Sequence, residues 1–278
     1  MTEQPNVGEA ARPLNPRRLV LALLGELYRD HCAGPFRAVD LVCVLQAAGV
    51  SAPAARAALD RFVLRGLLLR DKSTRGVSYE LTEAGEQLLA AGSARVHALA
   101  PFEPQGAGWT IVTFSVPEGH RGLRHKLRAA LTWAGFALLR DGVWIAAGER
   151  DTEVALDALS GEAEAAGIIA FRAHDLDAFP MAGRVHGTWD LQALRAAHEE
   201  FLERWGHPES AMPAASALAA TTLLVADWLT LLRKDPRLPF EYLGDDWPAQ
   251  RSHAAYLACR ERFAEQAYTE GFALVPAS

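Results

Sequence analysis

Residues 51–81 read SAPAARAALDRFVLRGLLLRDKSTRGVSYEL, and the hydrophobic pattern of this stretch changes halfway. Before Gly66 the apolar residues recur at the spacing of one helical face, which predicts a helix over Ala52–Arg65. The expected buried residues of this helix are Ala55, Ala58, Leu59 and Phe62. After Gly66 the pattern predicts two short strands, Leu67–Arg70 and Val77–Leu81, joined by the polar turn DKSTRG. The stretch therefore predicts a helix followed by a β-hairpin.

Further helices are expected on either side of this stretch. Asn15 and Pro16 are typical of a helix start, and apolar residues follow at helical spacing: Leu19, Val20, Leu23, Leu24 and Leu27. A second helix is expected over Ala38–Ala48, with a buried set of Val39, Val42, Val44 and Leu45. After the hairpin, Glu83–Leu99 should form a helix that leads to the next domain. Three helices followed by a hairpin describe a winged helix-turn-helix, whose third helix enters the major groove of DNA.

The charge of the chain is unevenly distributed. The 278 residues carry a net charge of −6, yet between residues 15 and 78 ten Lys/Arg stand against five Asp/Glu. This segment therefore carries +5 and the remainder −11. A basic block on an acidic chain favours an anionic polymer as the partner of that block. A chance fluctuation over a solvated surface is the alternative interpretation.

The third helix and the hairpin tip supply the candidate DNA contacts. Arg56 lies in the first turns of the helix, and its planar guanidinium suits the two acceptors of guanine in the major groove. Ser51, the expected N-cap, can donate to a phosphate together with the helix amides. The full set of candidates is Ser51, Arg56, Asp60, Arg61, Lys72, Thr74 and Arg75. Alternatively, Arg56 and Arg61 are ordinary solubilising charges on a helix face.

The middle of the chain alternates strand and helix patterns. Strands are expected at Trp109–Val116, Phe136–Leu139, Val143–Ala146 and Ile168–Ala173, and helices at Arg121–Trp133 and Thr152–Ala166. Asp141-Gly142 is a hairpin-turn signal between two of these strands. The resulting β-α-β-β-α-β order is the ferredoxin-like plan.

The last third of the chain is predicted to be helical. LQALRAAHEEFLERW (191–205) places apolar residues at helical spacing, and residues 212–232 and 251–268 have the same character. Between the last two helices lies a Pro-rich loop, RKDPRLPFEYLGDDWPAQ (233–250). The tryptophans of this region either pack in the core or line an apolar pocket for an aromatic effector.

Several of these segments resemble the phenylacetate-degradation repressor family, PaaX. The resemblance rests on AARAALDRFVLRGLL (54–68), YELTEAGEQLL (79–89) and WTIVTFSVPEGHRGLRHKLRAALTWAGFALLRDGVWIAAG (109–148). RKDPRLPFEYLGDDWP (233–248) is similar to that family's DP-x-LP…L…WP signature. The resemblance spans about residues 16–270, and its central and C-terminal signatures are more specific than the winged helix.

The resemblance implies a repressor of an aromatic, phenylacetate-type catabolic operon that an aryl-CoA thioester such as phenylacetyl-CoA releases from operator DNA. Because CoA carries phosphate charges, its pocket should combine apolar walls with Arg or Lys. The candidate effector residues are Trp228, Arg233, Lys234, Arg237 and Trp247, although the same residues could simply hold the signature loop in place. A regulator of this family that answers to another acyl-CoA, or to a free aromatic acid, is the alternative.

The family's central domain is similar to the small CRISPR-associated endoribonuclease fold, which makes a metal-dependent nuclease a less favoured alternative. Such an enzyme needs a carboxylate at the end of the first strand to hold a divalent cation. Residues 113–116 are TFSV, and the next acid is Glu118. His120 and His125 stand among basic residues whose charges would repel a metal ion, so no metal site is predicted.

No catalytic motif is recognisable, because GxSxG, Walker A, HExxH and GxGxxG patterns are absent from the sequence. We therefore expect a regulator and not an enzyme, with no catalytic residues and no cofactor. Cys32, Cys43 and Cys259 are expected to be small buried residues in a reducing cytoplasm. The N-terminal MTEQPNVGEAARP has no apolar segment typical of a signal peptide or an anchor, so no membrane partner is expected.

The sequence thus predicts an α+β multidomain protein. A winged-helix DNA-binding domain with a linker helix is expected over 15–100, a ferredoxin-like domain over 101–180, and a helical domain for effector binding or dimerisation over 181–278. Because winged-helix operators are usually palindromic, we also expect a homodimer, with a dimerisation role for the central sheet.

Overall fold

The structure is a computed structural model that describes residues 14–29, 34–74, 76–117, 120–156, 166–209 and 214–274. Its internal contacts divide the chain into two compact units. Unit 1 contains Met1–Ala94, Met212–Ala226 and Arg260–Ser278, and unit 2 contains Arg95–Ala211 and Asp227–Cys259. The α+β multidomain class is confirmed, whereas the three contiguous domain ranges stay a prediction.

Helices α1 (Pro16–Arg29), α2 (Ala38–Ala47) and α3 (Ala52–Leu64) begin unit 1 in the predicted order. The Asn15 side chain caps α1, since its Oδ1 accepts a hydrogen bond from the Arg17 amide at 3.1 Å. The predicted buried faces of α1 and α3 are confirmed, and Phe62 is the most exposed of these residues at 7%. The expected burial of Val39 on α2 is wrong, because this side chain is 63% exposed and Leu41 is buried instead.

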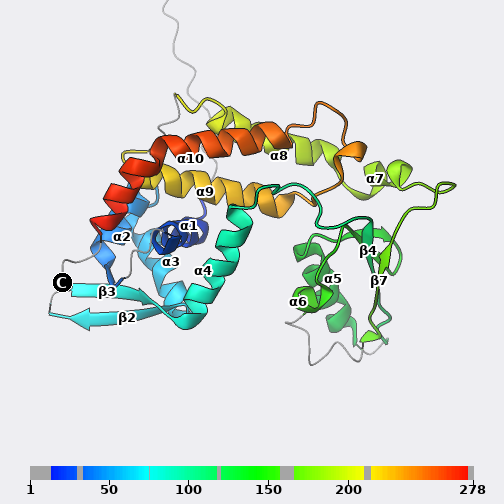
Figure 1. The fold of residues 1–278 in the computed structure, drawn as a ribbon. Helices are drawn as coiled ribbons and strands as arrows, with labels where there is room; N and C mark the ends of the chain where they lie inside the picture. The colour runs from blue at the N-terminus through cyan, green and yellow to red at the C-terminus, as the bar shows by residue number, and fades with distance from the viewer. Residues whose placement is uncertain are drawn as a thin grey trace, which may run out of the picture. The chain divides into compact units, whose positions relative to one another are not determined.

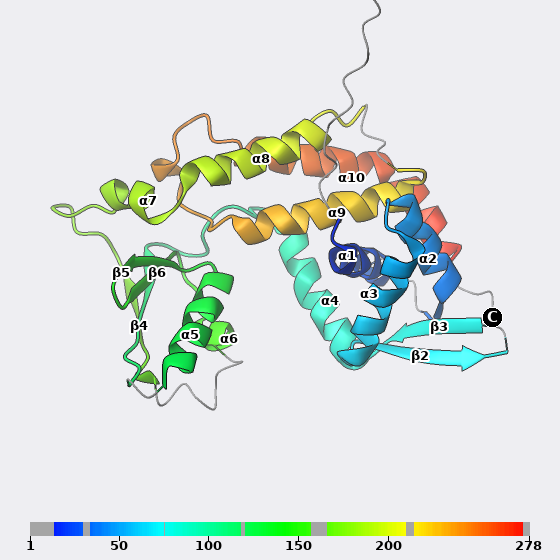
Figure 2. The same cartoon turned by 180° about the vertical axis from the view of Figure 1, so that it is seen from behind.

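A small antiparallel sheet follows, with the strand order β1-β3-β2. Strands β2 (Leu68–Ser73) and β3 (Gly76–Leu81) form the predicted hairpin, which projects beyond the helices of this unit (Figures 1 and 2). Both strands are longer than expected, so the connecting turn is shorter than DKSTRG. The sequence did not predict β1 (Phe36–Arg37), which pairs with β3. Helix α4 (Glu83–Val96) comes after the hairpin, as predicted.

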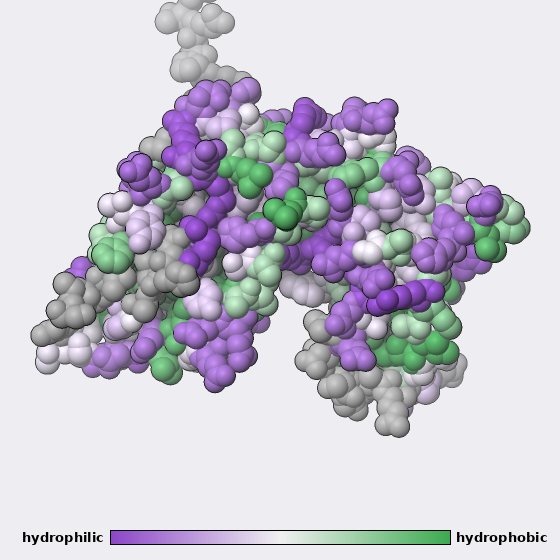
Figure 3. All heavy atoms as spheres, viewed as in Figure 1, coloured by the Kyte–Doolittle hydropathy of each residue, from purple (hydrophilic) through white to green (hydrophobic). Residues whose placement is uncertain are grey.

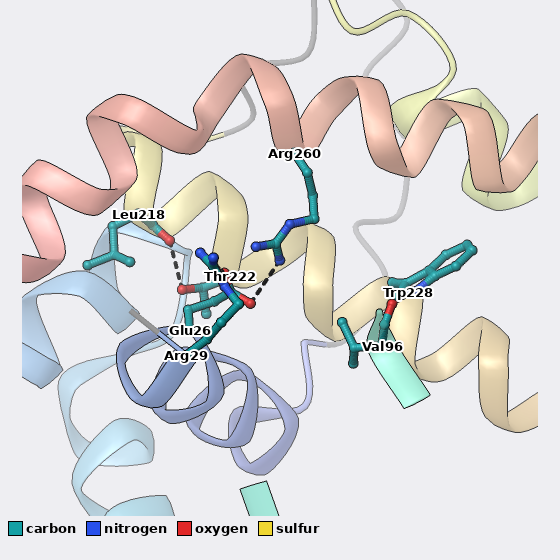
Figure 4. Close-up of polar contacts among 7 residues, drawn as sticks. All are labelled: Glu26, Arg29, Val96, Leu218, Thr222, Trp228 and Arg260. Carbon is teal, nitrogen blue, oxygen red and sulfur yellow. Dashed lines mark hydrogen bonds and ion pairs between the residues drawn. The ribbon is translucent and has the colours of Figure 1, made fainter. Parts of the chain in front are cut away.

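A buried carboxylate joins α1 to a distant part of the chain in unit 1. Helix α10 (Ala249–Phe272) brings Arg260 to Glu26, and Arg260 Nη1 donates to Glu26 Oε1 at 2.9 Å (Figure 4). Arg29 Nη2 lies 3.4 Å from the other oxygen of the same carboxylate. Glu26 is 3% exposed, so two guanidinium groups compensate the cost of burying its charge.

The central sheet belongs to unit 2 and has the strand order β5-β6-β4-β7. Its strands are β4 (Trp109–Thr113), β5 (Ala137–Arg140), β6 (Val143–Ala147) and β7 (Ile169–Ala173). Helices α5 (Arg121–Trp133) and α6 (Thr152–Leu156) lie on one side of this sheet (Figures 1 and 2). The predicted β-α-β-β-α-β order is confirmed; the remainder of the helix expected up to Ala166 falls on residues 157–165, outside the described residues.

The central strands β4 and β6 are largely buried on both faces of the sheet, whereas the edge strand β7 is exposed. Side chains alternate along β6, so that Trp144 and Ala146 pack with α5 and Ile145 and Ala147 face the other way. This second face meets Leu238 of the signature loop and residues near helix α7 (Ala182–Thr188). The predicted C-terminal helices are present as α8 (Leu191–Trp205), α9 (Ala217–Lys234) and α10, and the loop contains the short helix η4 (Phe240–Tyr242).

The described helices include none with both the length and the apolar character needed to cross a membrane. Hydrophobic residues appear only in patches among hydrophilic ones on the face drawn in Figure 3. Cys259 is buried as expected, whereas Cys43 is exposed, which corrects its expected burial. Cys32 lies outside the described residues.

We predict that Glu26→Ala lowers the free energy of unfolding by about 3 kcal/mol, because the partly buried Arg260 would lose its ion pair with this carboxylate. Chemical denaturation measures this change. Glu86→Ala, which removes an exposed carboxylate of α4, is the matched control and should change stability by under about 0.5 kcal/mol. Equal losses in the two variants would contradict the assigned role of Glu26.

Candidate functional site

Helix α3 presents two exposed arginines from the predicted DNA-contact set. Arg56 and Arg61 lie on its surface, and neither guanidinium has a hydrogen-bond or ion-pair partner in the described part of the chain. Ser51 occupies the N-cap position, but its side chain makes no capping hydrogen bond and is exposed. The first turn of α3 therefore offers a hydroxyl and free backbone amides together.

Asp60, another predicted DNA contact, has partners within unit 1. Its Oδ1 accepts a hydrogen bond from Arg70 Nη1 at 3.1 Å and lies 3.5 Å from the Tyr79 hydroxyl, which donates to it. Burial raises the pKa of Tyr79, and the negative charge of Asp60 raises it further. These contacts attach α3 to both strands of the hairpin, while a DNA contact by Asp60 stays a prediction.

The hairpin carries the remaining candidates. The expectation that Lys72 belongs to the turn is wrong, because β2 continues to Ser73 and Lys72 pairs with Val77. Thr74 lies in the turn, and both Lys72 and Thr74 are exposed. Arg75 lies outside the described residues.

The two tryptophans predicted for the effector are packed against other side chains in unit 2. Trp228 is completely buried, its ring stacks on Tyr256 at a centroid distance of 4.3 Å, and its Nε1 donates to the Val96 carbonyl at 3.2 Å (Figure 4). Trp247 is 9% exposed, with the Arg195 guanidinium 5.2 Å from its ring centroid. These contacts are those of core residues, so an effector role for either tryptophan remains only a prediction.

The three basic effector candidates lie at and just after the end of α9. Arg233 and Lys234 are exposed, and the Arg233 guanidinium lies 5.3 Å from the ring centroid of Trp133. Arg237 has a positive φ of 58°, and its amide donates to Asp235 Oδ1 at 2.6 Å. This local hydrogen bond stabilises a turn that a residue with a β-carbon adopts only at some cost.

Two arginines that the sequence did not single out converge on the same place. Arg95 Nη2 donates to the Leu232 carbonyl at 2.6 Å, and Arg150 Nη2 donates to the Pro236 carbonyl at 2.8 Å. Burial lowers the pKa of Arg150 to about 10, together with the positive charges of Arg237 and Arg95. Burial also lowers the pKa of Arg95 and of Arg237. We call Arg95, Arg150 and Arg237 the arginine cluster.

A buried hydrogen-bonded set of Ser252, His198 and Asp235 lies beside this cluster. His198 Nδ1 is 3.0 Å from the Ser252 hydroxyl, and its Nε2 is 2.9 Å from Asp235 Oδ2. The residue types are those of a hydrolytic triad, but Ser252 is 0% exposed and His198 1%. A substrate cannot reach a hydroxyl buried in this way, so the set acts as a structural link between α8, α10 and the loop that follows α9.

Among the described residues, no group of three or more His, Cys, Asp or Glu side chains is arranged to hold a metal ion. His120 and His125 are both exposed, and His125 lies on α5.

Comparison with models of protein families gives three matches along the chain. Residues 15–85 match the model described as PaaX-like protein, residues 103–178 the PaaX protein central Cas2-like domain, and residues 189–270 the PaaX-like protein C-terminal domain. The chain therefore belongs to the PaaX-like proteins, and this membership indicates a DNA-binding transcriptional regulator.

A solved structure supports the same architecture. The uncharacterized protein Rv0674 from Mycobacterium tuberculosis is similar with a TM-score of 0.59 and 26% sequence identity, over 93% of this chain and 99% of that one. Comparison with curated proteins gives no match.

We predict that Trp228→Phe lowers the free energy of unfolding by about 1–2 kcal/mol, because the buried Val96 carbonyl would lose its donor. Thermal or chemical unfolding measures the change. Trp133→Phe, at a side chain that is 73% exposed, serves as the control and should be close to neutral. An unchanged stability of Trp228→Phe would show that this hydrogen bond is dispensable.

Proposed function

We propose that the protein is a transcriptional repressor that binds operator DNA through a winged helix-turn-helix built from α1–α3 and the β2–β3 hairpin. The observation that carries this proposal is Arg56, which is exposed on α3 and has no partner among the described residues. An arginine in this position of a recognition helix can make two hydrogen bonds to the major-groove edge of guanine.

The remaining contacts would hold the DNA backbone. Ser51 and the amides of the first turn of α3 can donate to one phosphate. Lys72 and Thr74 extend the basic surface along the hairpin, and Arg61 adds a further unpaired charge on α3. Arg75 is retained as a phosphate contact on sequence grounds alone.

The proposed target is an aromatic catabolic operon, with an aryl-CoA such as phenylacetyl-CoA as the effector that releases the DNA. Family membership supports the type of regulation. The basic residues at and just after the end of α9, Arg233, Lys234 and Arg237, support an effector that carries negative charge. If the effector is instead another acyl-CoA or a free aromatic acid, the competition experiment described below would detect it.

We predict that Arg56→Ala weakens operator binding by about 1–3 kcal/mol and relaxes the base preference at one operator position. Lys72→Ala should weaken binding to all sequences alike and reduce the slope of log affinity against log salt by about one. Fluorescence anisotropy over a series of operator variants measures both effects.

Arg184→Ala, at an exposed arginine of α7 in unit 2, is the matched control for these two variants and should leave DNA affinity unchanged. If Arg56→Ala also binds every operator variant as the wild type does, the proposed docking of α3 is wrong.

We infer that the protein binds DNA as a homodimer. Strand β7 lies at the edge of the central sheet, and its apolar side chains Ile169 and Phe171 are 54% and 53% exposed. Exposed edge strands of this kind commonly pair with another chain. Sedimentation at micromolar concentration should give the mass of two chains, and a monomer at that concentration would exclude this form of binding.

We predict that phenylacetyl-CoA releases labelled operator DNA, whereas acetyl-CoA, CoA and phenylacetate do so weakly. To move a complex from mostly bound to mostly free, the effector must favour the released state by about 5 kcal/mol. Competition binding with this panel and benzoyl-CoA measures the release. Failure of every acyl-CoA would overturn the effector class and leave the DNA-binding proposal in place.

A further inference from the structure

Two members of the arginine cluster place their charge where proteins usually neutralise it, whereas Arg95 is exposed. Arg150 and Arg237 are partly buried, and Arg95 contributes to lowering the pKa of Arg150. Buried charges are normally paired with an opposite charge, because their desolvation costs several kcal/mol per ion. In the described part of the chain, no carboxylate forms an ion pair with any of these guanidinium groups.

Several donors of the cluster are also unused. The Nε atoms of Arg150 and Arg237 are buried and have no hydrogen-bond partner. No described residue accepts a hydrogen bond from any part of the Arg237 guanidinium. Buried polar groups are nearly always hydrogen-bonded in native proteins, so such donors indicate a missing acceptor.

The negatively charged groups near the arginine cluster do not compensate its positive charge. Asp235 raises the pKa of Arg150 and Arg237, but its oxygens already accept from His198 and from the Arg237 amide. The C-terminal end of α9 adds only about half a negative charge. Arg233 increases the excess, because its charge lowers the pKa of Arg95. The place therefore retains a net positive charge of more than one unit.

We propose that Arg95, Arg150 and Arg237 bind a phosphate-type anion, either a diphosphate or a phosphomonoester. Guanidinium groups are planar forks whose N–H donors match two oxygens of a phosphate group. A ligand with two or more negative charges fits better than a carboxylate, because one carboxylate would leave most of the positive charge uncompensated. The phosphate oxygens would be the acceptors that Arg150 Nε and Arg237 Nε lack.

The source of this phosphate is a small molecule, and here the inference rests on the proposed function. CoA carries a diphosphate and a phosphomonoester, so the arginine cluster would hold its phosphate end while the acyl group binds elsewhere in unit 2. Inorganic phosphate or diphosphate is the other source of the same chemistry, and separate titrations distinguish the two.

The test is isothermal titration of the full-length protein with inorganic diphosphate, inorganic phosphate, CoA and phenylacetate at constant ionic strength. Diphosphate and CoA should bind to the wild type, and phenylacetate alone should not compete with diphosphate. Arg237→Gln and Arg150→Gln should each weaken diphosphate binding about tenfold or more. Arg140→Gln, at an exposed arginine of β5, is the matched control and should bind as the wild type does.

A second measurement separates ligand binding from a structural role. Burial lowers the pKa of Arg237 in spite of Asp235, and Arg237→Gln removes no side-chain hydrogen bond, so its unfolding temperature without anion should equal or exceed that of the wild type. The rise in unfolding temperature on adding diphosphate should then disappear. Arg237→Lys retains the positive charge but lacks the planar guanidinium. It should therefore bind diphosphate with an affinity between those of the wild type and Arg237→Gln.

These experiments distinguish a failure of the anion site from a failure of the proposed function. Wild-type diphosphate affinity in Arg237→Gln, or no binding of diphosphate and CoA to the wild type, would overturn the anion site. If diphosphate binding needs Arg237 but no acyl-CoA releases DNA, the anion site stands and the effector assignment falls. If phenylacetyl-CoA releases DNA from Arg237→Gln at the wild-type concentration, the effector stands and its phosphates do not use this cluster.

Discussion

The Asp235 carboxylate holds together the part of unit 2 in which the C-terminal helices meet the central sheet. One oxygen lies 2.9 Å from His198 Nε2 and the other accepts the Arg237 amide, so α8 and the signature turn are fixed at one point. That turn sets the Pro236 carbonyl against Arg150, which lies three residues after the end of β6. It also directs Leu238 into the core on the second face of the sheet. The loop is also attached to the sheet by the Arg150 hydrogen bond to Pro236 and by the packing of Leu238.

The two units differ in how the charges of buried side chains are compensated. Unit 1 pairs such a charge with opposite charges of its own, and unit 2 leaves two partly buried arginines without such a pair among its described residues. In unit 1 the Glu26 carboxylate is enclosed by Arg260 and Arg29, so the charge is compensated within the fold. In unit 2, Arg150 and Arg237 are partly buried, and neither has an ion-pair partner among the described residues. A fold that needed these arginines only for stability would gain by pairing them or by replacing them with apolar residues. Partly buried cations without an ion-pair partner are what the proposed anion site requires.

The sequence could predict those parts of the fold that depend on the spacing of apolar residues within one helix or strand and on its capping residue. The buried face of α3 follows from spacing within one helix, and the cap of α1 follows from Asn15 alone. Val39 was assigned to the wrong face, because α2 is apolar nearly all round and only its packing against α1 and α3 selects Leu41 for burial. The sequence does not predict strand β1 for a related reason. Two residues are too few to show an alternating hydrophobic pattern, and this strand is formed only by its pairing with β3.

The candidate anion site could not be predicted, because the contacts that form it join Arg95 to Leu232 and Arg150 to Pro236, 137 and 86 residues apart. The sequence identified Arg237 only because it lies within the signature loop. Arg95 lies in the last turn of α4, the helix that follows the β2–β3 hairpin along the chain. A bound anion changes DNA affinity only if it binds one arrangement of the protein more tightly than the other. Arg95 can contribute to that distinction only if the anion changes its hydrogen bond to the Leu232 carbonyl, which uses one of the five N–H donors of the guanidinium.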